Sequence, residues 1–128
     1  MNIKAIDHIV LTVKNIDSTC AFYAQVLGMH VTTFDKSRKA LSFGTQKINL
    51  HQHGQESEPK ASKPTPGSAD LCFVTAVPLS DVIEHLKLNC VELLEGPVQR
   101  TGAVGAVLAV YFRDPDGNLI EVLNYESA

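Results

Sequence analysis

The spacing of apolar and polar positions changes several times along the chain, and each change predicts a new element. In residues 3–13 the two kinds alternate and β-branched side chains are frequent, which is typical of a strand. In residues 18–27 the apolar positions share one side of a helix. Asn15 or Asp17 can cap this helix at its start, and Gly28 can end it in a left-handed conformation. The predicted elements of the first half are a strand at 3–13, a helix at 18–27, and strands near 29–35, 39–44 and 46–53.

The second half repeats this order of elements. Pro78 suits the first turn of a helix and Asn89 suits its exit. The stretch RDPDG at 113–117 predicts a tight hairpin turn, because Pro sets φ and Asp-Gly tolerates positive φ. The predicted elements are a strand at 69–77, a helix at 78–89, and strands near 90–97, 104–113 and 118–125.

Between the halves the chain is rich in Pro, Ser, Glu, Lys and Gly, which predicts a linker or a mobile loop. We expect an α+β fold in one domain spanning 1–128, with module one at about 1–54, the linker at about 55–68 and module two at about 69–128. Each module has the order βαβββ, and its helix covers only one face of its sheet. Two modules can bury the other face around a shared cavity, so we expect a cupped, barrel-like mixed sheet with the helices outside.

Several polar residues share a strand face with apolar neighbours, which needs explaining because buried charges are paired or bind metal. When the two halves are superimposed, His8 falls opposite Asp70 and Asn49 falls opposite Glu121. If these side chains and His51 face one cavity, they form a mixed nitrogen and oxygen donor set suited to Zn, Ni, Mn or Fe(II). Each residue alone also fits an ordinary role, as a hydrogen-bonded histidine, a solvated glutamate or a strand-end cap.

Composition narrows the class of partner. The 128 residues are 45% hydrophobic and 20% charged, with a formal net charge of −3, which is ordinary for a globular protein and lacks the basic stripe of a nucleic-acid surface. The apolar runs are too short to span a membrane, and the start MNIKAIDHIVLTV lacks the zones of a signal peptide. The three cysteines form no disulfide framework. We therefore expect a cytoplasmic protein with a small-molecule substrate and neither nucleic acid nor membrane as a partner.

Two stretches resemble the vicinal-oxygen-chelate superfamily, which includes glyoxalase I and bleomycin-resistance proteins: IDHIVLTVKNIDSTCAFYAQVLGM near the start and YFRDPDGNLIEVLN near the end. The segments KINLHQ, GSADLCF and EGPVQRTGA are similar to short stand-alone members described as glyoxalase domain-containing or virulence-associated. The resemblance covers essentially the whole chain.

In metal-dependent members the ligands come from the first and last strand of each module. His8 and Glu121 match two of these positions, whereas the other two fall on Asn49 and Asp70 and depart from the family's pattern. The resemblance implies a divalent metal held by His8, His51 and Glu121, with Asp70 as a fourth ligand or as a partner that orients an imidazole. It also implies Glu121 as the catalytic base. Asn49 and Arg100 are the expected substrate-binding residues, and Arg100 lies in a glycine-containing stretch expected to arch over the cavity mouth.

Three functions follow from the resemblance. The first is a metal-dependent lyase or isomerase that acts on a small oxygenated substrate. The second is a metal-free protein that binds or sequesters a small molecule, as bleomycin-resistance proteins do. The third is an Fe(II) ring-cleaving dioxygenase. A homodimer is expected in each case.

Overall fold

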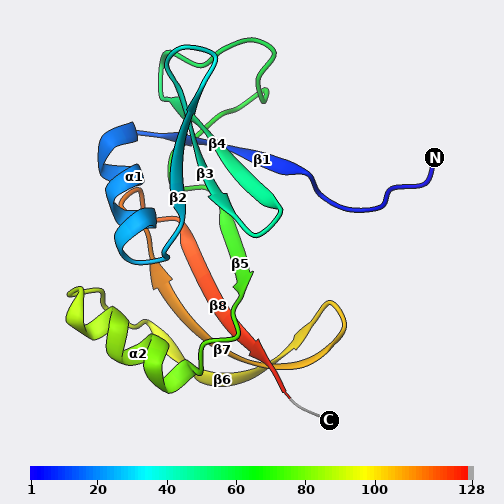
Figure 1. The fold of residues 1–128 in the computed structure, drawn as a ribbon, viewed down its shortest axis with the longest axis vertical. Coiled ribbons are helices and arrows are strands. Elements are labelled where there is room, and N and C mark those ends of the chain that lie inside the picture. The colour runs from blue at the N-terminus through cyan, green and yellow to red at the C-terminus, as the bar shows by residue number, and fades with distance from the viewer. Residues whose placement is uncertain (127–128) are drawn as a thin grey trace. The chain divides into compact units, whose positions relative to one another are not determined.

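The computed structural model describes residues 1–126, which form two compact units: Met1–Gly67, and a second unit that begins at Ser68. The first unit (Figure 1) contains β1 (His8–Val13), α1 (Ile16–Gln25), β2 (His30–Phe34), β3 (Arg38–Phe43) and β4 (Gln46–Gln52). The second contains β5 (Asp70–Val74), α2 (Leu79–Leu88), β6 (Glu95–Gly102), β7 (Gly105–Arg113) and β8 (Leu119–Tyr125). The prediction of two βαβββ modules is confirmed.

The two sheets have the same topology. Their strand orders are β1-β4-β3-β2 and β5-β8-β7-β6, so each is an open sheet of four strands. In each unit the first strand pairs in parallel with the last, and the remaining pairs are antiparallel. No helix within residues 1–126 is long and apolar enough to cross a membrane.

Two predicted strand boundaries are wrong. β1 begins at His8 and not at residue 3, because its partner β4 begins only at Gln46 and offers no backbone to pair with earlier residues. The strand predicted near 90–97 lies instead at Glu95–Gly102. Residues that follow α2 stay tied to it: Cys90 adopts a φ of 57°, and the Val91 N–H donates to the Leu86 carbonyl at 2.9 Å. They are therefore unavailable to a strand.

α1 begins and ends two residues earlier than the predicted helix at 18–27, and Asn15 is the one of the two predicted caps that is used. The Asn15 side-chain oxygen accepts a hydrogen bond from the Ser18 N–H at 2.8 Å, which satisfies one of the free donors at the helix start. Gly28 follows the helix with a φ of 69°, a conformation that costs glycine little.

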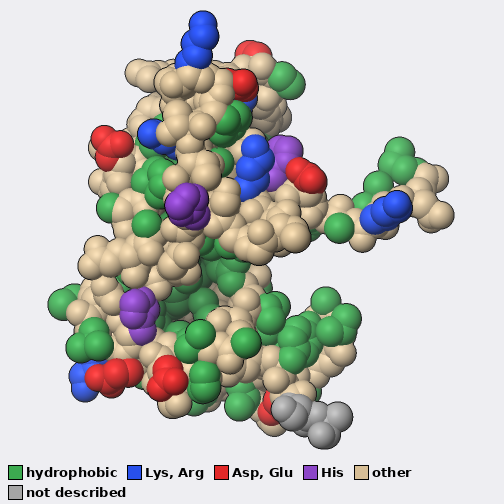
Figure 2. Space-filling model, viewed as in Figure 1, with side chains coloured by type: hydrophobic (Ala, Val, Ile, Leu, Met, Phe, Trp, Pro, Cys, Tyr) green, Lys and Arg blue, Asp and Glu red, His purple; other side chains and the backbone are tan. Residues whose placement is uncertain are grey.

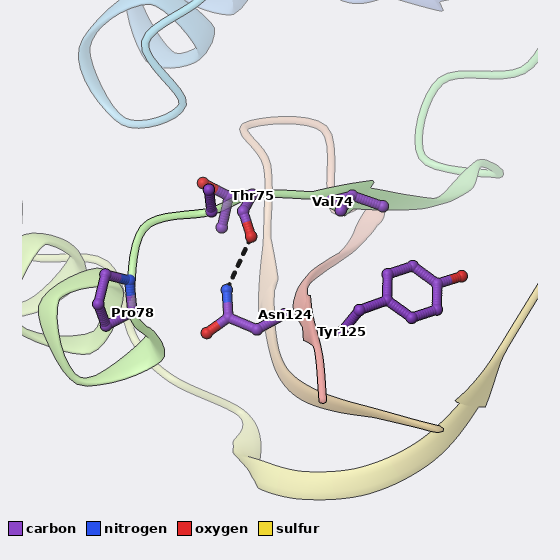
Figure 3. Close-up of a pocket in the computed structure, with 6 residues that line it drawn as sticks. Val74, Thr75, Pro78, Asn124 and Tyr125 are labelled. Carbon is purple, nitrogen blue, oxygen red and sulfur yellow. Dashed lines mark hydrogen bonds between the residues drawn. The ribbon is translucent and has the colours of Figure 1, made fainter. Parts of the chain in front are cut away.

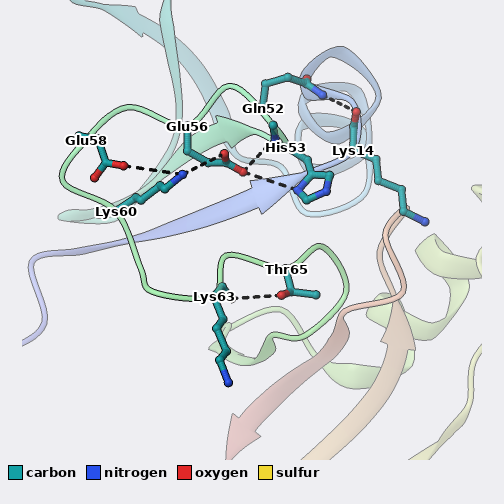
Figure 4. Close-up of polar contacts among 9 residues, drawn as sticks. Lys14, Gln52, His53, Glu56, Glu58, Lys60, Lys63 and Thr65 are labelled. Atoms are coloured by element: carbon teal, nitrogen blue, oxygen red, sulfur yellow. Dashed lines mark hydrogen bonds and ion pairs between the residues drawn. The ribbon is translucent and has the colours of Figure 1, made fainter.

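A side-chain amide at the end of each last strand holds the start of the helix in its own unit. In the first unit the Gln52 Oε1 accepts from the Ile16 N–H at 3.2 Å, and its Nε2 donates to the Lys14 carbonyl (Figure 4). In the second unit the Asn124 Oδ1 accepts from the Leu79 N–H at 3.0 Å. These amides lie on the sheet face that the helix covers.

The covered face of each sheet carries much of the core. In the first unit its buried residues are Leu11, Val13, Leu41, Ile48 and Leu50. In the second unit they are Val110, Phe112, Ile120 and Val122. Because side chains alternate along a strand, the residues between these positions point to the opposite face, here called the helix-free face of each sheet.

The segment predicted as a linker holds no helix or strand between residues 55 and 68, yet one glutamate anchors its start. The Glu56 side chain is only 5% exposed and lies 3.5 Å from the His53 Nδ1 and 3.8 Å from the Lys60 Nζ (Figure 4). Its carboxylate also accepts from the Gly54 N–H at 3.0 Å. Hydrogen bonds from the backbone N–H of Glu56 itself and from that of Gly54 are the main reason that the pKa of Glu56 is lowered.

Candidate functional site

Every predicted site residue lies on the helix-free face of its own sheet. The strand register agrees with the superposition of the two halves, since Asn49 pairs with Val10 on the first strand of its unit and Glu121 pairs with Cys72 on the first strand of the other. Asn49 and Glu121 thus occupy corresponding positions. His8 and Asp70 each begin the first strand of their unit, so they correspond as well.

In the first unit the helix-free face carries a partly exposed histidine and two buried polar side chains. His8 is 41% exposed, and its Nδ1 lies 2.8 Å from the Asp7 carboxylate. Asn49 and His51 are 6% and 7% exposed. The His51 Nε2 lies 3.5 Å from an Arg38 guanidinium nitrogen, a long and weak contact. The Asn49 Oδ1 has no hydrogen-bond partner within the described chain, which is costly for a buried acceptor.

In the second unit Glu121 lies between Cys72 on β5 and Tyr111 on β7, which pair with it directly in the sheet. Desolvation of the thiol, together with the charges of Glu121 and Asp70, raises the pKa of Cys72 to about 11. The thiol is therefore protonated at neutral pH and acts as a hydrogen-bond donor to Glu121, not as a nucleophile.

Arg100 lies in strand β6, not in an arch over a cavity mouth, so this part of the sequence prediction is wrong. Pairing with β7 extends the chain here and places Arg100 opposite Val107. The Arg100 guanidinium carbon lies 5.6 Å from the centre of the Tyr111 ring, and its Nη2 donates to Glu95 at 3.2 Å. Burial raises the pKa of Tyr111, and its hydrogen bond with Arg100 opposes that shift. Arg100 and Glu121 are thus both neighbours of Tyr111.

The second unit also has an open cavity of about 460 Å³, which none of the predicted site residues lines. Its lining residues (Figure 3) are Val74, Thr75, Ala76, Pro78, Asn124 and Tyr125. The Asn124 amide already donates to two backbone carbonyls, and the Tyr125 hydroxyl accepts from the Val104 N–H at 3.2 Å. The cavity is therefore lined by apolar and uncharged polar side chains, with no carboxylate, imidazole or amine among them.

The predicted metal ligands come from both units, with His8 and His51 in the first and Asp70 and Glu121 in the second. Within either unit, residues 1–126 contain no group of three or more His, Cys, Asp or Glu side chains placed to hold a metal. On the face shown in Figure 2, basic and acidic side chains are interspersed.

Sequence reasoning missed a cationic cluster on the helix-free face of the first unit. It consists of Phe34, Arg38 and Lys47, with the Arg38 guanidinium carbon 4.8 Å and the Lys47 Nζ 4.3 Å from the centre of the Phe34 ring. Alternation within KINLHQ places Lys47 on the same face as Asn49, so the signal was present. Arg38 lies on another strand, so its place in the cluster could be predicted only with the register of the strands.

Comparisons with known proteins agree with the repeated module. The family model of the Glyoxalase/Bleomycin resistance protein/Dioxygenase superfamily matches residues 5–122. The chain is 57% identical over 125 residues to virulence protein STM3117 of Salmonella typhimurium strain LT2, covering 98% of this chain and 87% of that protein. It is 52% identical over 128 residues to glyoxalase domain-containing protein RDO1 of Mycosarcoma maydis, covering 100% of this chain and 72% of that protein.

The crystal structure of STM3117 matches with a TM-score of 0.97 and 56% identity, covering 98% of this chain and 100% of that chain. An integron cassette protein from the V. cholerae mobile metagenome also matches with a TM-score of 0.97 and 56% identity, covering 98% of each chain.

Proposed function

Because this chain belongs to the glyoxalase/bleomycin resistance protein/dioxygenase superfamily, we propose that it is a metal-dependent enzyme of the lyase or isomerase type that acts on a small oxygenated substrate. The proposed ligands of a divalent Zn, Ni, Mn or Fe(II) ion are His8, His51, Asp70 and Glu121. The observation that carries the proposal is the matched placement of nitrogen and oxygen donors on the helix-free faces of both units. We also propose that the protein is a cytoplasmic homodimer. Sedimentation velocity would measure its oligomeric state.

The donor chemistry fits a metal of this kind. The contact between Asp7 and the His8 Nδ1 keeps a proton on that nitrogen and leaves Nε2 as the lone-pair donor. A carboxylate on the far nitrogen is the usual companion of a metal-binding histidine. Glu121 supplies an anionic oxygen, which suits the same ions. His51 fits less well, because Arg38 must leave its Nε2 before that nitrogen can bind a cation.

The surroundings of Glu121 suit a base that must be held in one position. When bound, the metal would polarise a substrate oxygen and so acidify a neighbouring carbon. The Glu121 carboxylate would leave the ion transiently and accept the proton from that carbon. Cys72 and Tyr111 flank Glu121 in the sheet, and each makes a hydrogen bond with its carboxylate. Asn49 and Arg100 are the proposed substrate-binding residues.

The test is the metal content of protein purified without added metal or a metal-binding tag. We expect a near-stoichiometric divalent metal in the natural chain and its loss in a His8→Ala/Glu121→Ala variant. The matched control is Glu84→Ala/His85→Ala, which removes the same two residue types from exposed positions on α2 and should keep the metal. If the chain takes up none of the four ions on titration, the enzyme proposal is wrong.

The contacts also favour a second candidate, a metal-free protein that binds a small molecule. Asp7 already contacts His8, Arg38 contacts His51, and Cys72 contacts Glu121. These polar groups therefore have partners without a metal. This candidate predicts that variants of His8 and Glu121 change ligand affinity with no metal involved.

A further inference from the structure

The cationic cluster of Phe34, Arg38 and Lys47 places two positive charges against one ring. Like charges placed around one ring repel each other, so the arrangement favours an anion near them. The counter-charge present is the exposed Asp35 carboxylate, 3.8 Å from an Arg38 nitrogen. Lys47 has no ion-pair partner among residues 1–126. The cluster therefore keeps an excess of positive charge.

The sheet register shows what lies between the two cations. On the helix-free face, Lys47 pairs with Ser42, and Phe34 pairs with Arg38. The row between these pairs consists of Asn49 opposite Ala40. The Lys47 side chain reaches past this row to the Phe34 ring, so both cations lie at the ring, one row away from Asn49 on the same face.

Asn49 adds a requirement of its own. It is 6% exposed, and its Oδ1 lacks a hydrogen-bond donor within the described residues. A buried carbonyl oxygen without a donor costs free energy. The group that satisfies this oxygen must be a donor, such as a hydroxyl. The cations beside it select an anion.

We propose that Arg38, Lys47 and Asn49 form a binding site for a small hydroxycarboxylate. Its carboxylate contacts the two cations, with Arg38 presenting the planar fork that matches a carboxylate. Its hydroxyl donates to the Asn49 Oδ1. This inference rests on the proposed function, because it takes the hydroxycarboxylate to be the substrate of that enzyme. Binding of the hydroxycarboxylate itself needs no metal.

The experiment is an NMR titration of the full chain, treated with EDTA, with three probes that differ in one group each. Lactate carries both groups, propionate lacks the hydroxyl, and lactamide lacks the charge. We expect saturable shifts of the Asn49 side-chain amide with lactate, affinity lower by roughly three- to tenfold with propionate, and no saturable binding of lactamide. Equal binding of lactamide and lactate would overturn the proposal without any variant.

Variants locate the site. Arg38→Gln/Lys47→Gln should lower lactate affinity by about tenfold or more, because two charge-assisted contacts are lost. The matched control is Lys36→Gln/Lys39→Gln, which removes two charges from the same hairpin and should bind lactate as the natural chain does. Unchanged affinity in the first variant, or no saturable shift in the natural chain, contradicts the inference.

Metal content of the same proteins separates this inference from the proposed function. If the chain holds metal but lactate binding does not depend on Arg38 and Lys47, the hydroxycarboxylate site is wrong and the enzyme proposal stands. If the chain holds no metal but binds lactate as described, the site stands in a metal-free binding protein.

Discussion

Replacing Asn124 with alanine is expected to destabilise the second unit by about 2 kcal/mol. The Asn124 amide makes three hydrogen bonds: it accepts from the Leu79 N–H at 3.0 Å and donates to the Thr75 and Val77 carbonyls at 2.8 and 2.9 Å. The first two are partly buried and the third is exposed, so water can replace only the third. A net value of about 1 kcal/mol for each shielded bond gives the total.

Urea unfolding followed by circular dichroism measures this change as a shift of the midpoint at an unchanged slope. Asn89→Ala is the matched control, since its side chain makes one exposed hydrogen bond to the His85 carbonyl at 2.9 Å, and we expect a loss below about 0.5 kcal/mol. Asn124→Asp should cost at least as much, because it loses both donors and sets a carboxylate oxygen against two carbonyl oxygens. An Asn124→Ala value equal to that of Asn89→Ala would refute the reasoning.

Three further predictions concern single side chains. Glu121→Gln should lower the pKa of Cys72 below its value of about 11, because a charge and a hydrogen bond that oppose the thiolate are removed; an unchanged pH profile of iodoacetamide alkylation would contradict this. Arg38→Gln should raise zinc affinity measured by calorimetry, because it frees the His51 Nε2, and an unchanged affinity would show that His51 is not a ligand. The pKa of Glu56 is depressed in the folded chain, so its contribution is present above the ordinary value of 4.5 and is lost as pH falls through the folded pKa. The backbone amides of the linker should therefore lose part of their protection from hydrogen exchange in acid. In Glu56→Gln the same loss of protection should be present already at neutral pH.

The order of the elements was predictable because it depends on local patterns. Alternation and helical spacing identified both modules, and Asn15 was one of the two caps predicted for α1. The start of β6 was not predictable in this way, because it depends on Cys90 taking a left-handed conformation that extends the exit of α2. Arg100 was expected in an arch and lies in a strand, because pairing with β7 extends the chain there.

The parts of the candidate site that depend on the pattern within a single strand were predictable. The alternation of side chains placed His8, Asn49 and Glu121 on the helix-free faces of their sheets, and the strand register agrees. Contacts between strands were out of reach, since the approach of Arg38 to His51 depends on tertiary packing. The predicted ligand set itself stays a prediction until metal is measured.

The amide link between Gln52 and the start of α1 has a consequence for synthesis on the ribosome. The link joins residues 36 positions apart, and β1 likewise finds its parallel partner only in β4. A loop of this length must close before either contact stabilises the chain, and closure is the slow kind of step in folding. While the nascent chain ends before Gln52, β1 therefore has an unpaired edge and α1 lacks this hydrogen bond. We expect the first unit to become resistant to protease only when its last strand has left the exit tunnel, while the second unit is still being made.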